Sequence, residues 1–418
     1  MVKTTKLNKP HKKDPMTRNI IHLTQGICKY QMVKEIQENG NIFHFVHYTG
    51  ELTCPCCGSK NVIRKGTVHR SIQGVPIRLK PVYLELDIPR VQCKDCQKVR
   101  QIKISFADPF KRYTKNFEKF VLSLIGSMTD EAIAQLLHVS WDTIREIESD
   151  YLKKHFSRPS LKDVRWIAID EIAIKKGHKY LTVVMDLESG KVIHVGNGKD
   201  GKSLDIFWKR LKKSRAKIEC VSVDLSPAYT AAIEKHLPDA TIVYDHFHLI
   251  KLFNDMLSKA RRDLYNKLTD QGEKRLIKGT RFLLLKRPEN LDPDKGESER
   301  LQKALELNKD LSALYFLKEE FNSLWSTPNR TMAEGMLSDW LTTAEQMRIP
   351  ALQRFCKSIR RHAIGIINWH DIPISSGPLE GLNNKIKTLK RQAYGYRNLE
   401  FFKLKILAIH MTRYALVG

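Results

Sequence analysis

The sequence has no apolar run that approaches the roughly 20 residues of a membrane-spanning helix. Met1–Arg18 is basic and contains no apolar stretch like the core of a secretion signal. Internal repeats and long low-complexity tracts are absent as well. Hydrophobic residues make up 42% of the chain and charged residues 28%, a balance typical of globular domains. We therefore expect a globular cytoplasmic protein that makes no contact with a membrane.

Acidic residues are few compared with basic ones. The 418 residues include 46 Asp and Glu against 72 Lys and Arg, which gives a formal net charge of +26. Such an excess attracts polyanions over long range, and contacts with phosphates release counterions. Nucleic acid is therefore the expected partner. The alternative is a basic protein whose charge has no such role.

Disulfide-forming cysteine spacing is also lacking. Four of the eight cysteines form two closely spaced pairs, Cys54/Cys57 and Cys93/Cys96, on segments with strand character. Four thiolates satisfy a tetrahedral Zn²⁺, which predicts a structural zinc ribbon whose metal replaces the core that so small a unit cannot build. Cys56 competes with Cys57 as a ligand, and two pairs of reduced structural cysteines are the alternative. The isolated cysteines, expected to be incidental or in the core, are Cys28, Cys220 and Cys356.

Helical spacing replaces strand character over residues 116–155. Thr129 or Asp130 can cap one helix and Ser140 the next, with a short turn between them. This pattern predicts a helix-turn-helix whose second helix enters a DNA major groove. The alternative is an ordinary helical hairpin in a core. The residues expected on the exposed, DNA-binding side of the second helix are Trp141, Asp142, Thr143 and Arg145.

Strand and helix patterns alternate from Val164 to Tyr244. Three strands are followed by a helix, a strand, a helix and a last strand. Asp170 follows the apolar run 166–169 and Asp224 follows the run 221–223, so both are expected at the C-terminal ends of buried strands. This order, with an aspartate at the ends of the first and fourth strands, predicts a ribonuclease-H-like fold of the α/β class.

Three carboxylates, Asp170, Asp224 and Glu380, are expected to converge at one edge of this sheet. They would repel one another strongly unless divalent cations neutralised them. Phosphodiester cleavage uses two Mg²⁺ ions about 3.5–4 Å apart, held by carboxylates on a rigid frame. We expect Asp170 to bridge two Mg²⁺ ions, for which Mn²⁺ can substitute, with Asp224 and Glu380 each holding one. Glu171 is a weaker candidate because it points to the opposite face if the strand continues.

Basic and histidine residues near these acids are candidates for phosphate contacts. The basic residues follow Glu380 at near-helical spacing and are expected to bind DNA, with a solvated surface as the alternative. His248 follows a strand and is expected to touch a phosphate or to orient a catalytic carboxylate, with a purely structural histidine as the alternative. The basic residues are Lys385, Lys387, Lys390 and Arg391.

The domain organisation follows from these patterns. A zinc-ribbon-like unit and a helix-turn-helix are expected to precede a ribonuclease-H-like catalytic domain that an all-helical insertion interrupts. The expected segments are a basic flexible arm at 1–20, a zinc-ribbon-like DNA-binding unit at 21–110, a helix-turn-helix at 111–160, the first part of the catalytic core at 161–260, the helical insertion at 261–367, and the final helical part of the core at 368–418, which carries Glu380.

Four segments together resemble the DDE transposases of bacterial insertion sequences, with the closest likeness to the ISL-three family. They are Ile169-Asp170-Glu171, Val223-Asp224-Leu225-Ser226, Asp245-His246-Phe247-His248, and the stretch from Gly377 to Lys387. The similarity extends to 390–398, to the cysteine pairs and to the helix-turn-helix, and so covers nearly the whole chain from about residue 50. The stretch around Glu380 is its most specific element.

The resemblance implies that Asp170, Asp224 and Glu380 are the catalytic triad. It implies Mg²⁺-dependent cleavage of DNA at the terminal inverted repeats of the element. The exposed 3′-hydroxyl then attacks target DNA in one transesterification step. Two ends must be brought together, so a homo-oligomer is expected on DNA, in a bacterial protein associated with the nucleoid.

Two other functions remain open from the residues. One is a non-catalytic DNA-binding regulator derived from a transposase, which would use only the zinc ribbon and the helix-turn-helix. The other is a metal-dependent nuclease that cuts without joining, since cutting and joining use the same carboxylates. The presence of all three acids favours an enzyme over the regulator.

Overall fold

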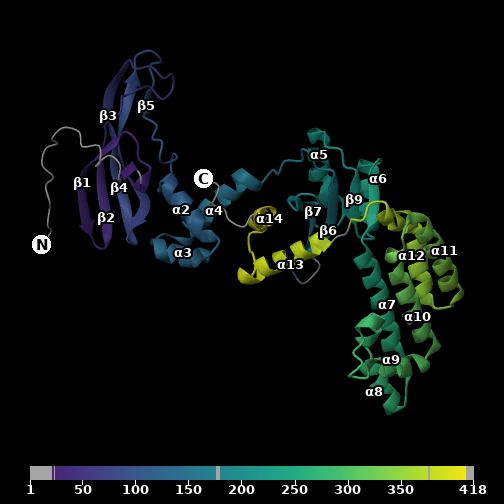
Figure 1. The fold of residues 1–418 in the computed structure, drawn as a ribbon. Helices are drawn as coiled ribbons and strands as arrows, with labels where there is room; N and C mark the ends of the chain where they lie inside the picture. The colour runs from purple at the N-terminus through teal and green to yellow at the C-terminus, as the bar shows by residue number, and fades with distance from the viewer. Residues whose placement is uncertain (1–20, 23, 176–178, 375–376, 411–418) are drawn as a thin grey trace. The chain divides into compact units, whose positions relative to one another are not determined.

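The chain forms two compact units, each treated separately below. The computed structural model describes residues 21–22, 24–175, 179–374 and 377–410. One unit contains the described residues up to His155, and the other runs from Phe156 to His410 (Figure 1). The basic arm expected at residues 1–20 lies outside the described residues.

The N-terminal unit is built on a five-stranded sheet in which β4 lies between β2 and β3 and also pairs with β5. β3 and β4 form a long antiparallel hairpin, whereas β2 and β4 are parallel. Buried aliphatic side chains such as Ile72 and Leu84 give the sheet its own hydrophobic core. The strands are β1 (Tyr30–Glu38), β2 (Asn41–Tyr48), β3 (Val62–Ile77), β4 (Lys80–Cys93) and β5 (Val99–Gln101).

Three helices follow this sheet: α2 (Lys115–Ile125), α3 (Asp130–Leu137) and α4 (Trp141–Phe156). The Thr129 side chain accepts a hydrogen bond from the Ala132 N–H and caps α3. Ser140 accepts one from the Thr143 N–H, at 3.2 Å, and caps α4. Both caps confirm the predicted helix starts. The apolar residues that join the helices include Ile133, Leu137, Ile144 and Ile147, each at most 2% exposed.

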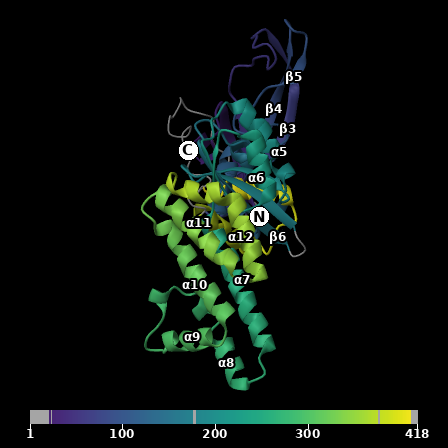
Figure 2. The same cartoon turned by 90° about the vertical axis from the view of Figure 1, so that its right-hand side faces the viewer.

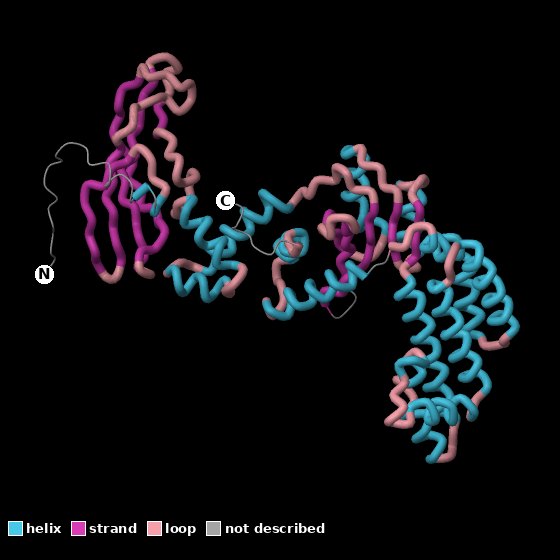
Figure 3. The backbone as a smooth tube through the Cα atoms, viewed as in Figure 1, coloured by secondary structure: helices cyan, strands magenta, loops and turns pink. Residues whose placement is uncertain are grey.

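The second unit contains a sheet in the order β10-β9-β6-β7-β8. β6, β7 and β8 are antiparallel, whereas β9 and β10 run parallel to β6. Figure 3 shows the strands in magenta and the helices in cyan. This mixed sheet with helices confirms the predicted α/β class. The strands are β6 (Trp166–Lys175), β7 (Lys179–Asp186), β8 (Val192–Asn197), β9 (Cys220–Val223) and β10 (Thr241–Tyr244).

Helices cover both faces of this second sheet. Phe207 of α5 (Asp205–Ser214) and Tyr229 of α6 (Pro227–His236) are buried against one face. Leu379 and Ile386 of α13 (Gly377–Gln392) and Phe402 of α14 (Leu399–Leu407) pack against the other. The two C-terminal helices, α13 and α14, therefore cover the face of the sheet that carries Ala168 and Ile172.

Asp170 does not end its strand, and this part of the prediction is wrong. β6 continues to Lys175 because its pairing with β7 continues to the end of a hairpin. Ile172 and Ile174 are both buried, so the apolar alternation runs past the aspartate. Asp170 instead lies in the middle of β6, at the level where the shorter parallel neighbour β9 stops.

An all-helical segment separates β10 from α13. Its longer helices pack side by side (Figures 1 and 2) around the rings of Phe253, Phe321, Trp340 and Phe355. No helix within the described residues combines the length and the apolarity needed to cross a bilayer. The helices are α7 (His246–Lys267), α8 (Gln271–Gly279), α9 (Glu297–Glu306), α10 (Lys309–Ser323), α11 (Arg330–Gln346) and α12 (Pro350–Ile367).

The contact between α12 and β10 depends on a glycine. A Cβ at Gly365 would lie 2.6 Å from the ring of Tyr244 and 3.3 Å from the Ile242 carbonyl oxygen. Gly365→Ala should therefore push the helix from the strand and lower the free energy of unfolding by about 1–3 kcal/mol. Urea unfolding measures this change.

The matched control is Gly335→Ala in the middle of α11, where a Cβ would meet no atom within 4 Å. Replacing a glycine in an open helical position should raise the free energy of unfolding by about 0.5–1 kcal/mol. If Gly365→Ala were as stable as this control, the close approach of α12 to β10 would be contradicted.

Candidate functional site

Three aspartates lie at one level across the parallel strands of the second sheet. Ile169 of β6, Val223 of β9 and Tyr244 of β10 are in register, and Asp170, Asp224 and Asp245 are the residues that follow them. The Asp245 N–H donates to the Val223 carbonyl at 3.0 Å, which extends the ladder by one residue. Asp170 and Asp245 are buried and Asp224 is half-buried. The fold thus brings Asp170 and Asp224 together, as expected from the sequence.

Burial and nearby acids make the charged form of Asp224 unfavourable. Burial raises the pKa of the Asp224 carboxyl, His248 opposes this, and the negative charges of Asp170 and Asp245 raise it further. Burial also raises the pKa of Glu171, and Asp224 adds to the effect. This concentration of carboxylates is a site where a cation would be stabilised.

His248 lies beside these acids, and its surroundings favour the protonated ring. Its Nδ1 lies 2.7 Å from Oδ2 of Asp245, and this hydrogen bond is the main cause of a raised pKa at His248. Burial opposes the shift, while Asp170 and Asp224 add to it. Asp245 therefore fixes the orientation and the charge of a histidine beside the other two aspartates.

The helix that carries Glu380 touches Asp170 through a different residue. Asn383 of α13 donates from Nδ2 to Oδ2 of Asp170 at 2.7 Å, and its own Oδ1 is buried without a hydrogen-bond partner among the described residues. Glu380 lies three residues earlier on the same side of α13 and is exposed. Among the described residues, no three acidic groups come within 4.8 Å of one another, so Glu380 is not gathered with Asp170 and Asp224.

Basic side chains line a cavity of about 690 Å³ between β6 and α13. Its floor is apolar, with Ile172 and Ile174 from the strand, and Tyr394 stands fully exposed at its rim. Of the predicted DNA-binding cations, Lys387, Lys390 and Arg391 line this cavity. Lys385 is exposed but is not part of the lining. The cavity begins two residues beyond Asp170 along β6.

The four predicted zinc ligands form a compact group at the open end of the β3–β4 hairpin. Sγ of Cys54 lies 3.6 Å from that of Cys96, and Sγ of Cys57 lies 3.5 Å from that of Cys93. All four sulfurs are within 4.8 Å of one another. Sulfurs on one tetrahedral zinc ion lie about 3.8 Å apart, given Zn–S bonds of about 2.3 Å. The geometry fits a structural zinc ion.

Two expectations about this cluster are refined. Cys56 is exposed and outside the group, and only its backbone N–H points toward it, at 3.4 Å from Sγ of Cys54. The N–H groups of Cys57 and Cys56 lower the pKa of the Cys54 thiol to about 6, which favours the thiolate that binds metal. The notion that metal replaces a core is wrong, because the sheet of this unit buries its own apolar side chains.

The predicted DNA-binding residues of α4 differ in their exposure to solvent. Trp141 is 41% exposed, and the Arg145 guanidinium lies 4.7 Å from the centre of its ring. Arg145 also pairs with Asp130 of α3 at 3.5 Å. The Thr143 hydroxyl lies 3.0 Å from that of Ser140 at the helix cap. Trp141 is thus the most accessible of the three, while Thr143 contacts the cap of its own helix and Arg145 joins α4 to α3.

Comparisons with known proteins match these units in order. A family model described as a transposase matches residues 167–406. A model of the zinc-finger of transposases IS204, IS1001, IS1096 and IS1165 matches residues 51–96, and one of the helix-turn-helix domain of transposase family ISL3 matches residues 102–152. The chain belongs to the ISL3 family of transposases. The zinc ribbon and helix-turn-helix predicted from the sequence are confirmed.

Individual relatives agree with this assignment. The transposase for insertion sequence element IS1001 of Bordetella parapertussis is 31% identical, over 85% of this chain and 88% of its own length. The transposase for IS1557 of Mycobacterium tuberculosis is 27% identical, over 82% of each chain. The Drosophila P element transposase strand transfer complex aligns with a TM-score of 0.40 at 10% identity, over 77% of this chain and 95% of that one, a likeness too weak to support an inference.

Two residues at the acidic cluster of this ISL3 transposase were not selected from the sequence. Asn383 lies one helical turn after Glu380, and that spacing is a signal that it shares a helix face with the acid. Asp245 follows an apolar strand just as Asp224 does, which is the same signal that selected Asp224. Neither the rotation of α13 nor the register of β10 could be read from local sequence.

The zinc site makes a prediction about local stability. Cys93→Ser, or chelation of the metal, should remove bound zinc and expose the hairpin end around residues 51–61 to protease, while the sheet core keeps the rest of the unit folded. Zinc content and the sites of limited proteolysis are measured. Cys56→Ser is the control and should retain both the metal and protease resistance; its loss of zinc would contradict the assigned ligand set.

The Asp245–His248 pair makes a prediction about pH. Asp245→Asn should lower the pKa of His248, followed by NMR of the ring in metal-free protein, because the main cause of its raised value is removed. A raised folded-state pKa stabilises the fold fully below the ordinary value of 6.5, and this contribution is lost as pH rises through the raised value. Asp239→Asn, an exposed change before β10, should leave the titration unchanged. Equal titration in both variants would contradict the pairing.

Proposed function

We propose that this transposase cleaves DNA strands at the terminal inverted repeats of an insertion sequence and joins the 3′-hydroxyl ends to target DNA by metal-dependent transesterification. The observation that carries the proposal is the register that sets Asp170 beside Asp224, with α13 bound to Asp170 through Asn383. Glu380, on that same helix, completes the proposed catalytic triad.

The residues around Asp170 fit hard divalent cations. The available donors are carboxylate oxygens and the buried Oδ1 of Asn383, which has no hydrogen-bond partner in the described part of the chain, and Mg²⁺ prefers oxygen ligands. Burial and neighbouring acids already disfavour the ionised form of Asp224, so a bound cation would relieve repulsion. Asp170, Asp224 and Glu380 would hold two Mg²⁺ ions, or Mn²⁺ in their place. When bound, such ions activate an attacking oxygen and stabilise a leaving oxygen at phosphorus.

Other side chains of the second unit would position the DNA. Lys387, Lys390 and Arg391 present positive charge along α13 and the cavity beside it, where they would bind backbone phosphates. The positive charge of His248, fixed by Asp245, would hold a phosphate or orient a carboxylate next to the reacting group. The binding of phosphates here would place a strand across Asp170.

The N-terminal unit would recognise the element ends. In helix-turn-helix proteins the second helix lies in the major groove and its first residues reach base edges. In this chain that helix is α4, and its exposed Trp141 stands at the start. The zinc ribbon would supply further contacts with the phosphate backbone. Since two ends must be joined in one reaction, we expect at least two copies of the chain on DNA, in the cytoplasm and associated with the nucleoid.

We also assign the second unit to the ribonuclease-H-like fold, interrupted by a helical insertion. Support comes from the strand order β10-β9-β6-β7-β8, with three antiparallel strands followed by two parallel ones. The helices α7–α12 lie in the chain between β10 and α13. In this arrangement the insertion separates the two aspartates from Glu380 in sequence.

Substitution of the acids tests the assignment. Asp170→Asn, Asp224→Asn and Glu380→Gln should each lower cleavage of end DNA by more than about a hundredfold, because the charge that stabilises the reacting phosphate is lost. Affinity for the same DNA should change little, since its recognition lies in the other unit. Cleavage is followed on labelled end duplexes with Mg²⁺, and binding by mobility shift.

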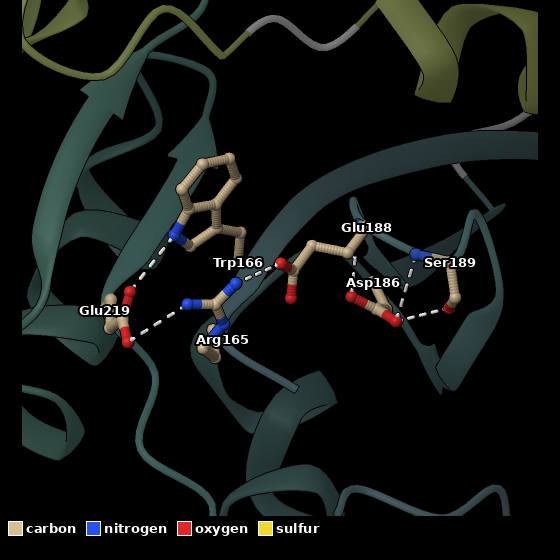
Figure 4. Close-up of polar contacts among 6 residues, drawn as sticks. All are labelled: Arg165, Trp166, Asp186, Glu188, Ser189 and Glu219. Atoms are coloured by element: carbon tan, nitrogen blue, oxygen red, sulfur yellow. Dashed lines mark hydrogen bonds and ion pairs between the residues drawn. The ribbon is translucent and has the colours of Figure 1, made fainter. Parts of the chain in front are cut away.

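Glu219→Gln is the matched control. Glu219 precedes β9, at the end of the sheet opposite Asp224, where it accepts a hydrogen bond from Trp166 at 3.3 Å and pairs with Arg165 (Figure 4). Removing this carboxylate should leave cleavage near the wild-type rate. Substantial cleavage by any of the three triad variants would defeat the assignment.

A strand-transfer assay with pre-cleaved ends separates the candidate activities. Joined product with Mg²⁺ is the result expected of the proposed transposase. Hydrolysis without joining would identify a metal-dependent nuclease, and DNA binding without either reaction would identify a regulator.

A further inference from the structure

An aromatic ring of the N-terminal unit is held fully in solvent. Phe110, in the loop between β5 and α2, is 99% exposed. Its backbone has φ of +66°, a left-handed conformation that non-glycine residues adopt at a cost. Both the exposure of the ring and the strain of the backbone are unfavourable in the isolated unit. This combination is typical of a residue that contacts a binding partner.

The two residues that follow Phe110 are anchored to the sheet and to α4. Arg70 of β3 donates to the Lys111 carbonyl at 2.6 Å, and the Gln73 N–H donates to the Arg112 carbonyl at 2.8 Å. The Lys111 ammonium lies 2.7 Å from Asp150 of α4 and also contacts Glu146. These contacts hold the backbone next to Phe110 between the sheet and the second helix of the helix-turn-helix. The loop therefore needs to lose little conformational freedom when the ring contacts a partner.

Two cavities meet at this ring. A groove of about 760 Å³ on one side has three exposed cations in its lining, Arg100, Lys103 and Arg112, and one acid, Asp108. A smaller cavity of about 330 Å³ on the other side reaches Ser140 and Thr143 at the start of α4. Phe110 lines both. The positive charge of the groove favours binding of a polyanion. The second cavity is lined in part by residues at the start of α4, the helix proposed to read bases.

We propose that Phe110 is a wedge that inserts between base pairs of the element end, beside the segment read by α4. Proteins that insert an apolar side chain between base steps unstack them and bend the duplex, while flanking cations hold the phosphates. Arg100, Lys103 and Arg112 are placed to hold phosphates on the groove side of the ring. The inference rests on the proposed function, because the ligand is the duplex of the terminal inverted repeat.

The test places 2-aminopurine at successive positions of an inverted-repeat duplex and uses the full chain without divalent metal. Wild-type protein should increase the fluorescence severalfold at one step, because the base there loses its stacking partner. Phe110→Ala should abolish this signal, while the affinity changes by less than about tenfold, since the lost contact is offset by the stacking that is kept. Phe110→Leu, which keeps an apolar wedge, should retain much of the signal.

Phe316→Ala is the control, because Phe316 is an aromatic residue of α10 that is 62% exposed. It should leave the signal unchanged.

Absence of any fluorescence change in a wild-type complex, or a signal that survives Phe110→Ala, would overturn the wedge and leave the proposed transposition intact. A changed melting temperature or oligomeric state of Phe110→Ala, with no fluorescence signal in wild type, would show that protein covers the ring. Failure of wild type to bind the duplex would overturn both proposals.

Discussion

The parallel pairing of β6 with β9 is the constraint on which the proposed site depends. It sets Asp170 and Asp224 at one level, and the pairing of β9 with β10 brings Asp245 to the same level. Burial raises the pKa of Asp224 in this row of acids, and the charges of Asp170 and Asp245 raise it further. The apolar faces of the sheet, covered by α5 and α6 on one side and α13 and α14 on the other, keep the row in place. Core packing thus maintains a charge arrangement that a cation would relieve.

Acidic and basic side chains gather at different places in the chain. Carboxylates gather at the edge of the second sheet, whereas cations line α13 beside it and the groove around Phe110 in the first unit. The proposed reaction would use both, because cations would hold the DNA backbone and acids with bound metal would act on the scissile phosphate. The cysteine cluster serves a more local purpose than expected, since the β-sheet of its unit has its own core and zinc would fix one end of the β3–β4 hairpin.

Local patterns in the sequence predicted the elements well where a residue's neighbours along the chain decide its state. The apolar run of β10 and the caps at Thr129 and Ser140 are of this kind. Features set by distant segments were not predicted. β6 passes Asp170 because β7 continues to pair with it, and Asn383 faces Asp170 because of how α13 is rotated on the sheet. The place of the strained, exposed Phe110 is likewise set by contacts of the next residue, Lys111, to β3 and α4, which no local pattern encodes.

The central claim is that Asp170, Asp224 and Glu380 jointly bind metal ions. The most direct measurement is Mn²⁺ binding by electron paramagnetic resonance, on the full chain bound to a terminal inverted repeat duplex. The account predicts two strongly held ions per active site in the wild-type complex and the loss of at least one in Asp224→Asn, with DNA still bound. Equal Mn²⁺ binding by the wild-type protein and Asp224→Asn would contradict it.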